Sequence, residues 1–480
     1  MSSSAEDVYQ NWVIKINDEL EAARRRDSDV NAEKEQWGKR SIYRIPASFT
    51  DVNQKAYKPQ AVSFGPYHHG EEHLKPMEVH KHRALVRFLR RSGKPLQHYL
   101  HSLEPLLQDL KDAYDTTTTH QVEEDERINS VGGQFLQLMI LDGCFMLEIL
   151  RTGAGSPKYC LGKDDYAPND PVFSDHGKLY VIPHLRRDML VLQNQLPMLL
   201  LYTLHAVANN GHNMHVDVEG SVEFMNDLII KIWNPNNFDP KKKLGKCLHV
   251  LDLYRKNLLW EQDKYYRKRQ KNVNKMRGAR EAARRRHGHK ARGGDDQIIR
   301  SATELYEAGI RFKKSKTQSL ADISFRSGVL RLPPITVDDT SESMFLNLIA
   351  FERSHFGAGN EVTSYISFMD NIIDSSKDVS LLHSSGIIQN AIGSDKAVAK
   401  LFNSLSKDTT MDPESSLDLV QNKVSEYCQK PWNEWRANLI HTYFRSPWAI
   451  LSVIAAIFLF ALTIVQTVYT VLPYYNHSNS

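Results

Sequence analysis

The sequence predicts a mainly α-helical protein: a large multi-helix globular domain with a small β-hairpin element and one C-terminal transmembrane helix. Three observations predict this fold class. Apolar residues recur every three or four positions along most of the 480-residue chain, as one face of a helix requires. Alternating strand signals are few. Residues 446–480 contain no Asp, Glu, Lys or Arg, and most of this stretch is apolar.

The composition is that of a folded protein. Apolar residues make up 41% of the chain and charged residues 25%, which excludes a collagen-like, low-complexity or globally disordered chain. The four cysteines stand singly, without a CxxC pair, so a disulfide scaffold and a zinc ribbon are excluded. This cysteine usage suits a reducing compartment. The positions are Cys144, Cys160, Cys247 and Cys428.

Residues 1–39 are predicted to form an N-terminal arm. They begin with serines and two acids and lack the basic region and apolar run of a signal peptide. Val8–Arg26 is predicted to be an amphipathic helix, because apolar residues such as Trp12 and Ile16 recur every four positions. We expect this helix to pack on the main body; a partner-binding arm is the alternative.

Residues 40–445 are predicted to form the helical domain. No internal repeat of fixed period is visible, so a helical solenoid is disfavoured. Ala61–Phe64 reads as a strand, and Asp322–Phe325 with Val329–Leu332 reads as a hairpin around Arg326-Ser327-Gly328. Helical periodicity is found in Met77–Ser92, Leu96–Tyr114, Phe135–Leu150, Leu185–Ala208, Val222–Trp233, Leu244–Trp260, Ile298–Ala308, Phe345–Phe351, Val362–Ile373, Asp395–Leu405, Leu417–Cys428 and Trp432–Phe444.

A strongly basic insert interrupts this domain at residues 264–294. Between Lys264 and Arg292 there are 13 Lys and Arg against one acid, Glu281. The favoured interpretation is a solvated, disordered loop between two core helices, since the segment lacks a clean apolar face. Contact with anionic lipid is the second interpretation, and nucleic-acid binding is the least favoured. The basic patch is formed by Lys264, Arg267, Lys268, Arg269, Lys271, Arg284, Arg285 and Arg286.

The C-terminal stretch predicts a membrane span over residues 446–472, followed by a short tail, 473–480. Its 18 to 25 apolar residues would extend roughly 27–38 Å as a helix, against a hydrocarbon core of about 30 Å. Arg436 and Arg445 precede the span and no charge follows it, so the large domain is expected in the cytosol. The organelle stays open between plasma membrane and endoplasmic reticulum. Asn476 begins an N-x-S sequon beyond the span and is a glycosylation acceptor in sequence.

No familiar catalytic signature is present: neither a phosphate-binding loop, a dinucleotide fingerprint, a nucleophile elbow nor a zinc-protease motif occurs. Asp142 and Asp188 lie in strongly apolar surroundings, with Gln195 seven residues after Asp188 and on the same face if the helix is continuous. A buried carboxylate must be paired or protonated. We therefore favour a structural polar network over a catalytic site. Its predicted members are Asp142, Asp188, Gln195, His68 and His69, with Arg44, Lys81, Arg186 and Arg187 as partners to choose among.

The two histidines belong to the motif GPYHHG, residues 65–70. Gly65-Pro66 and Gly70 predict turns that constrain the loop. A metal site is disfavoured, because no nearby cysteine completes the ligand set. The loop is expected to staple the domain internally, with a binding surface as the alternative.

Several blocks resemble, in the same order, the plant family called domain of unknown function 247. The similarity covers residues 40–472, and seven ordered blocks are far more specific than any single motif. They are SIYRIPASFTDVNQKAYKPQAVSFGPYHHG and its continuation (41–85), FLQLMILDGCFMLEIL (135–150), RRDMLVLQNQLPMLLLYTL (186–204), SATELYEAGIRFK (301–313), LRLPPITVDDTSESMFLNLIAFE (330–352), the block at 365–405 and RSPWAILSVIAAIFLF (445–460).

The resemblance implies a mainly helical plant protein with a C-terminal anchor. It supplies no enzyme activity, cofactor or catalytic residue that could be transferred to this chain. Some grass members are implicated as pollen-side determinants of self-incompatibility. We therefore expect a membrane-anchored interaction or signalling protein without catalytic activity, with an unidentified protein partner and no cofactor. The alternative is a membrane-tethered enzyme that uses Asp142, Asp188, His68 and His69.

Overall fold

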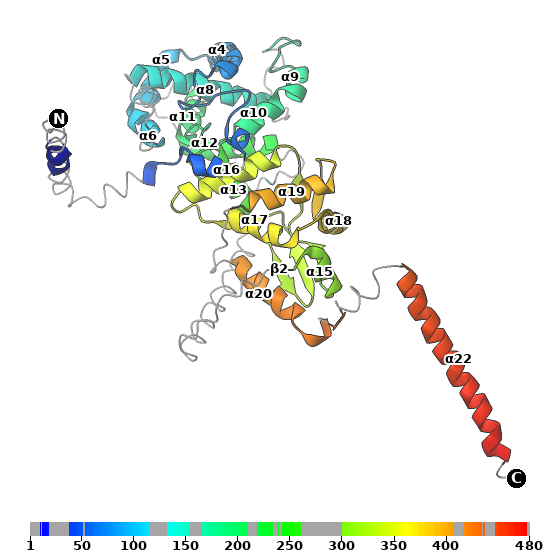
Figure 1. The fold of residues 1–480 in the computed structure, drawn as a ribbon. Helices are drawn as coiled ribbons and strands as arrows, with labels where there is room; N and C mark the ends of the chain where they lie inside the picture. The colour runs from blue at the N-terminus through cyan, green and yellow to red at the C-terminus, as the bar shows by residue number, and fades with distance from the viewer. Residues whose placement is uncertain are drawn as a thin grey trace. The chain divides into compact units, whose positions relative to one another are not determined.

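The computed structural model describes two compact units (Figure 1). Unit 1 comprises the described residues within Met1–Trp260 and Thr340–Val362, and unit 2 those within Glu261–Asp339 and Thr363–Ser480. The fold is mainly helical, as predicted. The structure describes residues 10, 12–18, 38–50, 53–115, 132–153, 166–209, 218–233, 239, 242–260, 300–407, 416–433, 435–436 and 447–477.

Unit 1 is built around a buried helix, α8 (Gly132–Gly153), against which α4, α5, α11 and α12 pack (Figure 1). In chain order the elements of unit 1 are α3 (Ala47–Thr50), η1 (Gln54–Tyr57), η2 (Glu72–Leu74), α4 (Lys75–Ser92), α5 (Leu96–Leu103), η3 (Glu104–Leu106), α6 (Leu107–Asp112), α8, α9 (Asp175–Tyr180), α10 (Ile182–Asp188), α11 (Met198–Asn209), α12 (Val218–Trp233), α13 (Val250–Leu259) and α16 (Ser341–Ser354).

Local sequence signals explain the ends of α4. Pro76 lies in its first turn, where a missing N–H costs nothing, and Gly93 ends it in the left-handed conformation with φ 67°. The buried face carries Ala84 and Phe88, one turn apart. This helix matches the predicted Met77–Ser92 except that it begins two residues earlier.

Unit 2 contains two small sheets and the helices around them. β2 and β3 form the predicted hairpin, joined by Ser327 (φ 51°) and Gly328 (φ 74°), the two positive φ values of a type I′ turn. The sequence missed β1, β4 and β5; β1 lies parallel to β3, in the order β1-β3-β2, and β4 lies parallel to β5. The elements are α15 (Ala302–Glu307), β1 (Arg311–Lys314), β2 (Ser324–Arg326), β3 (Val329–Leu332), β4 (Ile335–Val337), most of α17 (Glu361–Ile372), α18 (Ser376–Ser384), β5 (Ile388–Asn390), α19 (Asp395–Leu405), α20 (Ser416–Cys428) and α22 (Pro447–His477).

Four predicted elements are wrong in whole or in part. The helix predicted for Leu244–Trp260 begins only at Val250, as α13. The helix Leu185–Ala208 is two helices: α10 ends at Asp188, and α11 begins at Met198, directly after Pro197, which disfavours helix at the residue before it. The helix Leu96–Tyr114 is broken at Pro105 for the same reason. Ala61–Phe64 is not a strand, since its backbone groups bond to side chains instead of to a neighbouring strand.

Two helices bear on the membrane prediction. By length and composition residues Gly133–Gly153 of α8 could cross a membrane, but 83% of this apolar stretch is buried, as in the core of a soluble protein. α22 contains a shorter described apolar stretch, Ile454–Thr470, whose side chains are all exposed. Asn476 falls in the last turn of α22. Of the predicted N-terminal helix, residues 12–18 are helical; the basic insert, 264–294, lies outside the described residues.

Candidate functional site

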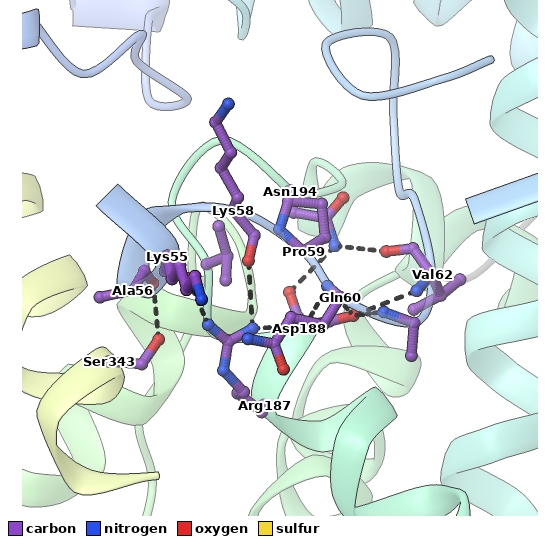
Figure 2. A network of polar contacts seen from close by, with 12 residues as sticks. Lys55, Ala56, Lys58, Pro59, Gln60, Val62, Arg187, Asp188, Asn194 and Ser343 are labelled. Atoms are coloured by element: carbon purple, nitrogen blue, oxygen red, sulfur yellow. Dashed lines mark hydrogen bonds and ion pairs between the residues drawn. The ribbon is translucent and has the colours of Figure 1, made fainter. Parts of the chain in front are cut away.

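The strongest polar cluster in unit 1 surrounds residues 60–65, which we call the 60–65 segment. The carboxylate of Asp188, fully buried at the end of α10, accepts hydrogen bonds from the backbone N–H groups of Gln60 (2.9 and 3.0 Å), Ala61 (2.6 Å) and Val62 (3.1 Å). Figure 2 shows its oxygens directed at this backbone. The fourth donor is the guanidinium of Arg187, whose Nη1 lies 2.8 Å from Asp188 Oδ1.

This geometry suits an ionised carboxylate, because both oxygens of Asp188 accept hydrogen bonds from N–H groups. Burial raises the pKa of Asp188 above its usual value, and the N–H donors and Arg187 reduce that rise without cancelling it. The charge is thus offset by four donor groups, three of them in the chain's own backbone.

Asn194 binds the same segment from the loop between α10 and α11. Its amide oxygen accepts from the N–H of Phe64 at 2.7 Å, and its amide nitrogen donates to the carbonyls of Val62 and Asp188, both at 3.0 Å. One side chain therefore satisfies a donor and an acceptor of an extended backbone, as a neighbouring strand would. Asn194 was not among the predicted network members; it lies between Gln193 and Gln195, and only Gln195 was singled out for the network from the sequence.

Asp142 and Lys81 form a fully buried ion pair, with Lys81 Nζ 2.7 Å from Asp142 Oδ1. Lys81 also donates to the carbonyl of Ser63 at 2.7 Å and pairs with Glu78 at 2.7 Å. The other oxygen of Asp142 accepts from the N–H of Gly65 at 2.8 Å. Burial raises the pKa of Asp142 and Lys81 lowers it, with burial the larger effect. Asp142, Lys81, Asp188 and Asn194 together are called the clamp below.

Gly65 ends the 60–65 segment in a conformation that suits glycine. Its φ is +74°, and a Cβ there would lie 2.7 Å from Tyr114 Oη and 3.0 Å from the carbonyl oxygen of Gln195. A side chain is excluded both by the left-handed backbone and by this close approach.

The predicted network member Gln195 does not share a helix face with Asp188, because the chain leaves the helix between them. Its amide nitrogen donates to the carbonyls of Met189 (2.7 Å) and Val191 (2.8 Å), and its oxygen accepts from the N–H of Leu251 at 3.1 Å. Gln195 therefore fixes the loop that carries Asn194.

Of the two predicted histidines, His68 contacts Glu71, outside the clamp. His68 is buried and its Nδ1 lies 2.7 Å from Glu71 Oε1, a hydrogen bond that lowers the pKa of Glu71. His69 is half-buried and also interacts with other groups. None of the bonds described for His68 reaches Asp142 or Asp188. Within the described residues, no three His, Cys, Asp or Glu side chains are grouped to hold a metal ion.

The loop that carries these histidines is tied to the interior by Tyr67. Its hydroxyl lies 3.2 Å from the carbonyl oxygen of Ile42 and 2.9 Å from that of Asp115. The Arg44 guanidinium stacks over its ring at 4.5 Å. Arg44, one of the four proposed partners of the buried acids, thus packs here.

The turn before the segment is held from two sides. Arg187 donates to the carbonyls of Lys55 (2.7 Å) and Lys58 (3.1 Å). From α16, Ser343 and Asn347 both donate to the carbonyl of Ala56, at 2.6 and 2.9 Å (Figure 2 shows the Ser343 bond). Residues 55–65 are thereby fixed by side chains from at least four separate stretches of sequence: α4, α8, residues 187–194 and α16.

Glu148 is a further buried acid that was not predicted. Glu148, on α8, is fully buried and pairs with Arg91 of α4 and with Arg151 at 2.9 Å, while Tyr166 donates to it at 3.0 Å. Burial raises the pKa of Glu148, but the two arginines outweigh it and hold the pKa below its usual value. The acid within LEIL was as visible in the sequence as Asp142.

Chemically, the clamp positions backbone. Its carboxylates bind backbone N–H groups and cations, and its amide mimics a strand. These bonds satisfy the polar backbone groups of a buried segment that has no strand partner. Each such group left unpaired would cost about 1–3 kcal/mol of stability.

Comparison with known proteins agrees with the ordered blocks in the sequence. The model of DUF247, described as plant protein of unknown function, matches residues 42–462. UPF0481 protein At3g47200 of Arabidopsis thaliana is 30% identical over 447 residues, which cover 91% of this chain and 87% of that protein. Putative UPF0481 protein At3g02645 of the same plant is 30% identical over 174 residues, 36% of this chain and 33% of that protein. No solved structure gives a significant match. The chain therefore belongs to the plant DUF247 family.

Proposed function

We propose that this protein is a membrane-anchored interaction or signalling component, in which α22 crosses the bilayer and the two units recognise a protein partner without catalysing a reaction. Its most specific form is a recognition component of pollen self-incompatibility, as implied by the family resemblance. The observation that carries the anchor is the exposed apolar surface of α22.

Every described side chain of α22 from Ile454 to Thr470 is exposed, and Ile457 and Phe458 are each 64% exposed. Leaving a large apolar side chain in water forfeits about 1.5–3 kcal/mol relative to burial. A helix that is apolar on all sides and packed on nothing is stable in hydrocarbon, where its backbone groups are satisfied internally.

The length also fits. A helix from Pro447 to His477 has 31 residues and extends roughly 46 Å at 1.5 Å per residue, enough to cross a hydrocarbon core of about 30 Å and both interfaces. Three threonines, Thr463, Thr467 and Thr470, donate their hydroxyls to carbonyls four residues earlier, which removes free polar groups from the helix surface. Arg436 and Arg445 lie on the N-terminal side and favour a cytosolic position for the two units.

We include the absence of a catalytic role in the proposal because the two predicted acids, Asp142 and Asp188, are bonded within the fold. Asp142 and Asp188 have their oxygens bonded to backbone N–H groups and to Lys81 and Arg187. A catalytic acid or base needs an oxygen within reach of a substrate. These bonds favour a structural role for both residues.

The anchor is tested with the full chain expressed in plant cells. We expect the protein to sediment with membranes and to resist extraction by alkaline carbonate. The variant Phe458→Arg/Leu462→Arg places two charges one turn apart near the centre of the span, each costing about 2.5–3.5 kcal/mol at that depth. It should appear in the soluble or extractable fraction, whereas the matched apolar variant Phe458→Leu/Leu462→Phe should stay in the membrane. A charged variant that resists carbonate as the parent does would refute the anchor.

The orientation and the recognition role need separate measurements. In sealed vesicles, protease added outside should digest the two units and leave a C-terminal tag protected; the reverse pattern refutes the cytosolic orientation. In a self-incompatible plant that carries the gene, pollen without the protein should be accepted by stigmas that reject the parent pollen. Unchanged rejection would refute the self-incompatibility role.

A further inference from the structure

Unit 2 exposes a pair of tryptophans close in sequence to α22. Trp432 and Trp435 are 74% and 70% exposed, although tryptophan is usually largely buried, and their rings lie 6.5 Å apart in a tilted arrangement. We propose that the two indoles insert into the headgroup region of the membrane that α22 crosses, so that this face of unit 2 is held against the bilayer. The inference rests on the proposed anchor.

The pair is mounted on a fixed support. Asn433 donates to the carbonyl of Tyr427 at 2.8 Å, which ties the tryptophan turn to the end of α20. Tyr427 in turn packs edge-on against Phe325 of β2 with ring centroids 5.4 Å apart, and Cys428 is buried beneath. The exposed indoles are therefore attached to a packed part of unit 2.

The chain itself limits the distance to the bilayer. Ten residues, 437–446, separate Arg436 from Pro447 at the start of α22. Arg436 and Pro447 are thus eleven residue steps apart, which reach at most about 40 Å when fully extended and less in any other conformation. When α22 spans the membrane, Arg436, the neighbour of Trp435, must lie within this distance of the start of the span.

The chemistry of the surface matches a membrane interface. Indole rings combine an apolar body with an N–H donor and concentrate at the headgroup level of membrane proteins. Exposed Lys430 and Arg436 flank the pair, and with Glu434 between the tryptophans residues 430–436 keep a net charge of +1, which favours an acidic cytoplasmic leaflet. Two aromatic rings between two cations suit a surface that is anionic outside and apolar beneath.

The test uses the full chain reconstituted into vesicles of phosphatidylcholine and phosphatidylserine with brominated acyl chains, which quench nearby tryptophans. The variant Trp432→Phe/Trp435→Phe removes both indoles while keeping apolar rings. Subtracting its emission from that of the parent isolates the signal of the pair. We expect this signal to be shifted to shorter wavelength and to lose most of its intensity, more so with bromines near the headgroup than with bromines deep in the chain.

Trp233→Phe is the matched control, because Trp233 lies in unit 1 and packs edge-on against Tyr254; its isolated signal should not respond to brominated lipid. If the signal of the pair is quenched by aqueous acrylamide and not by brominated lipid, the rings face water or another protein and the inference is overturned while the anchor stands. If the chain does not float with the vesicles at all, the anchor and this inference fall together.

Discussion

Replacing Gly65 with alanine tests whether the 60–65 segment is fixed as tightly as its contacts indicate. Gly65 and Gly93 both have left-handed φ values, 74° and 67°, but only Gly65 is crowded. A Cβ on Gly93 meets nothing within 4 Å, whereas one on Gly65 would lie 2.7 Å from Tyr114 Oη. Both substitutions therefore carry the free-energy cost of a left-handed backbone, and only Gly65→Ala adds the cost of a steric clash.

The magnitudes follow from these two terms. The left-handed conformation costs a non-glycine residue roughly 1–2 kcal/mol, and alanine recovers about 0.4–1 kcal/mol by restricting the unfolded chain. Gly93→Ala should therefore destabilise by about 1 kcal/mol. Gly65→Ala adds an overpacking cost of about 1–3 kcal/mol, because Tyr114 is buried against Tyr67 and Phe135 and cannot move aside freely.

The measurement is equilibrium unfolding of the full chain in detergent micelles by urea, followed by circular dichroism, with Gly93→Ala as the control. We expect Gly65→Ala to lose about 2–4 kcal/mol and to shift its midpoint well below that of Gly93→Ala. Equal midpoints for the two variants would refute the reasoning, since the segment would then be free to relax around an added methyl group.

Three further outcomes concern polar groups of unit 1 and use the same assay. Asp188→Asn should cost about 2–5 kcal/mol, because an NH₂ group would face backbone donors. Asp109→Asn, in the exposed ion pair that Asp109 forms with Lys39, should shift the midpoint far less; similar losses for the two would contradict the clamp. Asn194→Asp keeps the acceptor for the N–H of Phe64 but points oxygen lone pairs at the carbonyls of Val62 and Asp188. We expect it to lose about 2–4 kcal/mol of stability, and an unchanged midpoint would contradict the role of Asn194. Burial lowers the pKa of His249 to about 4, so its contribution to stability is fully present above about pH 6.5 and falls by about 3 kcal/mol as the pH drops toward 4. His249→Asn, which can still cap α13 through its bond to the N–H of Asp252, should flatten that fall, and an unaltered pH profile would exclude His249 as its source.

Sequence predicted those parts of the fold that depend on nearby residues. Pro76 and Gly93 mark the ends of α4, and the Ser327-Gly328 turn predicts the hairpin, because each signal acts within a few residues. The parallel strands were missed since their pairing joins residues distant in the chain and leaves no local pattern. The break between α10 and α11 was also missed, because apolar residues continue through the loop between them and look like part of one helix.

The candidate site was predictable only in its acids. Asp142 and Asp188 stood out because a carboxylate in an apolar run must find a partner. The partners could not be chosen: Lys81 was one of four cations considered, and the main ligands of Asp188 are backbone N–H groups 126 to 128 residues away. Backbone donors have no sequence signature, so a polar clamp of this kind becomes visible only in the fold.

The bond between Asn347 and Ala56 joins residues 291 positions apart and has a consequence for synthesis. At about 5–20 residues per second, a ribosome needs roughly 15–60 s to pass from one to the other. During that interval the turn at Ala56 waits for α16, while residues 261–339 of unit 2 are made in between. Nascent unit 1 therefore carries an incomplete core for many seconds. In this window, chaperones that hold exposed apolar surface would engage it.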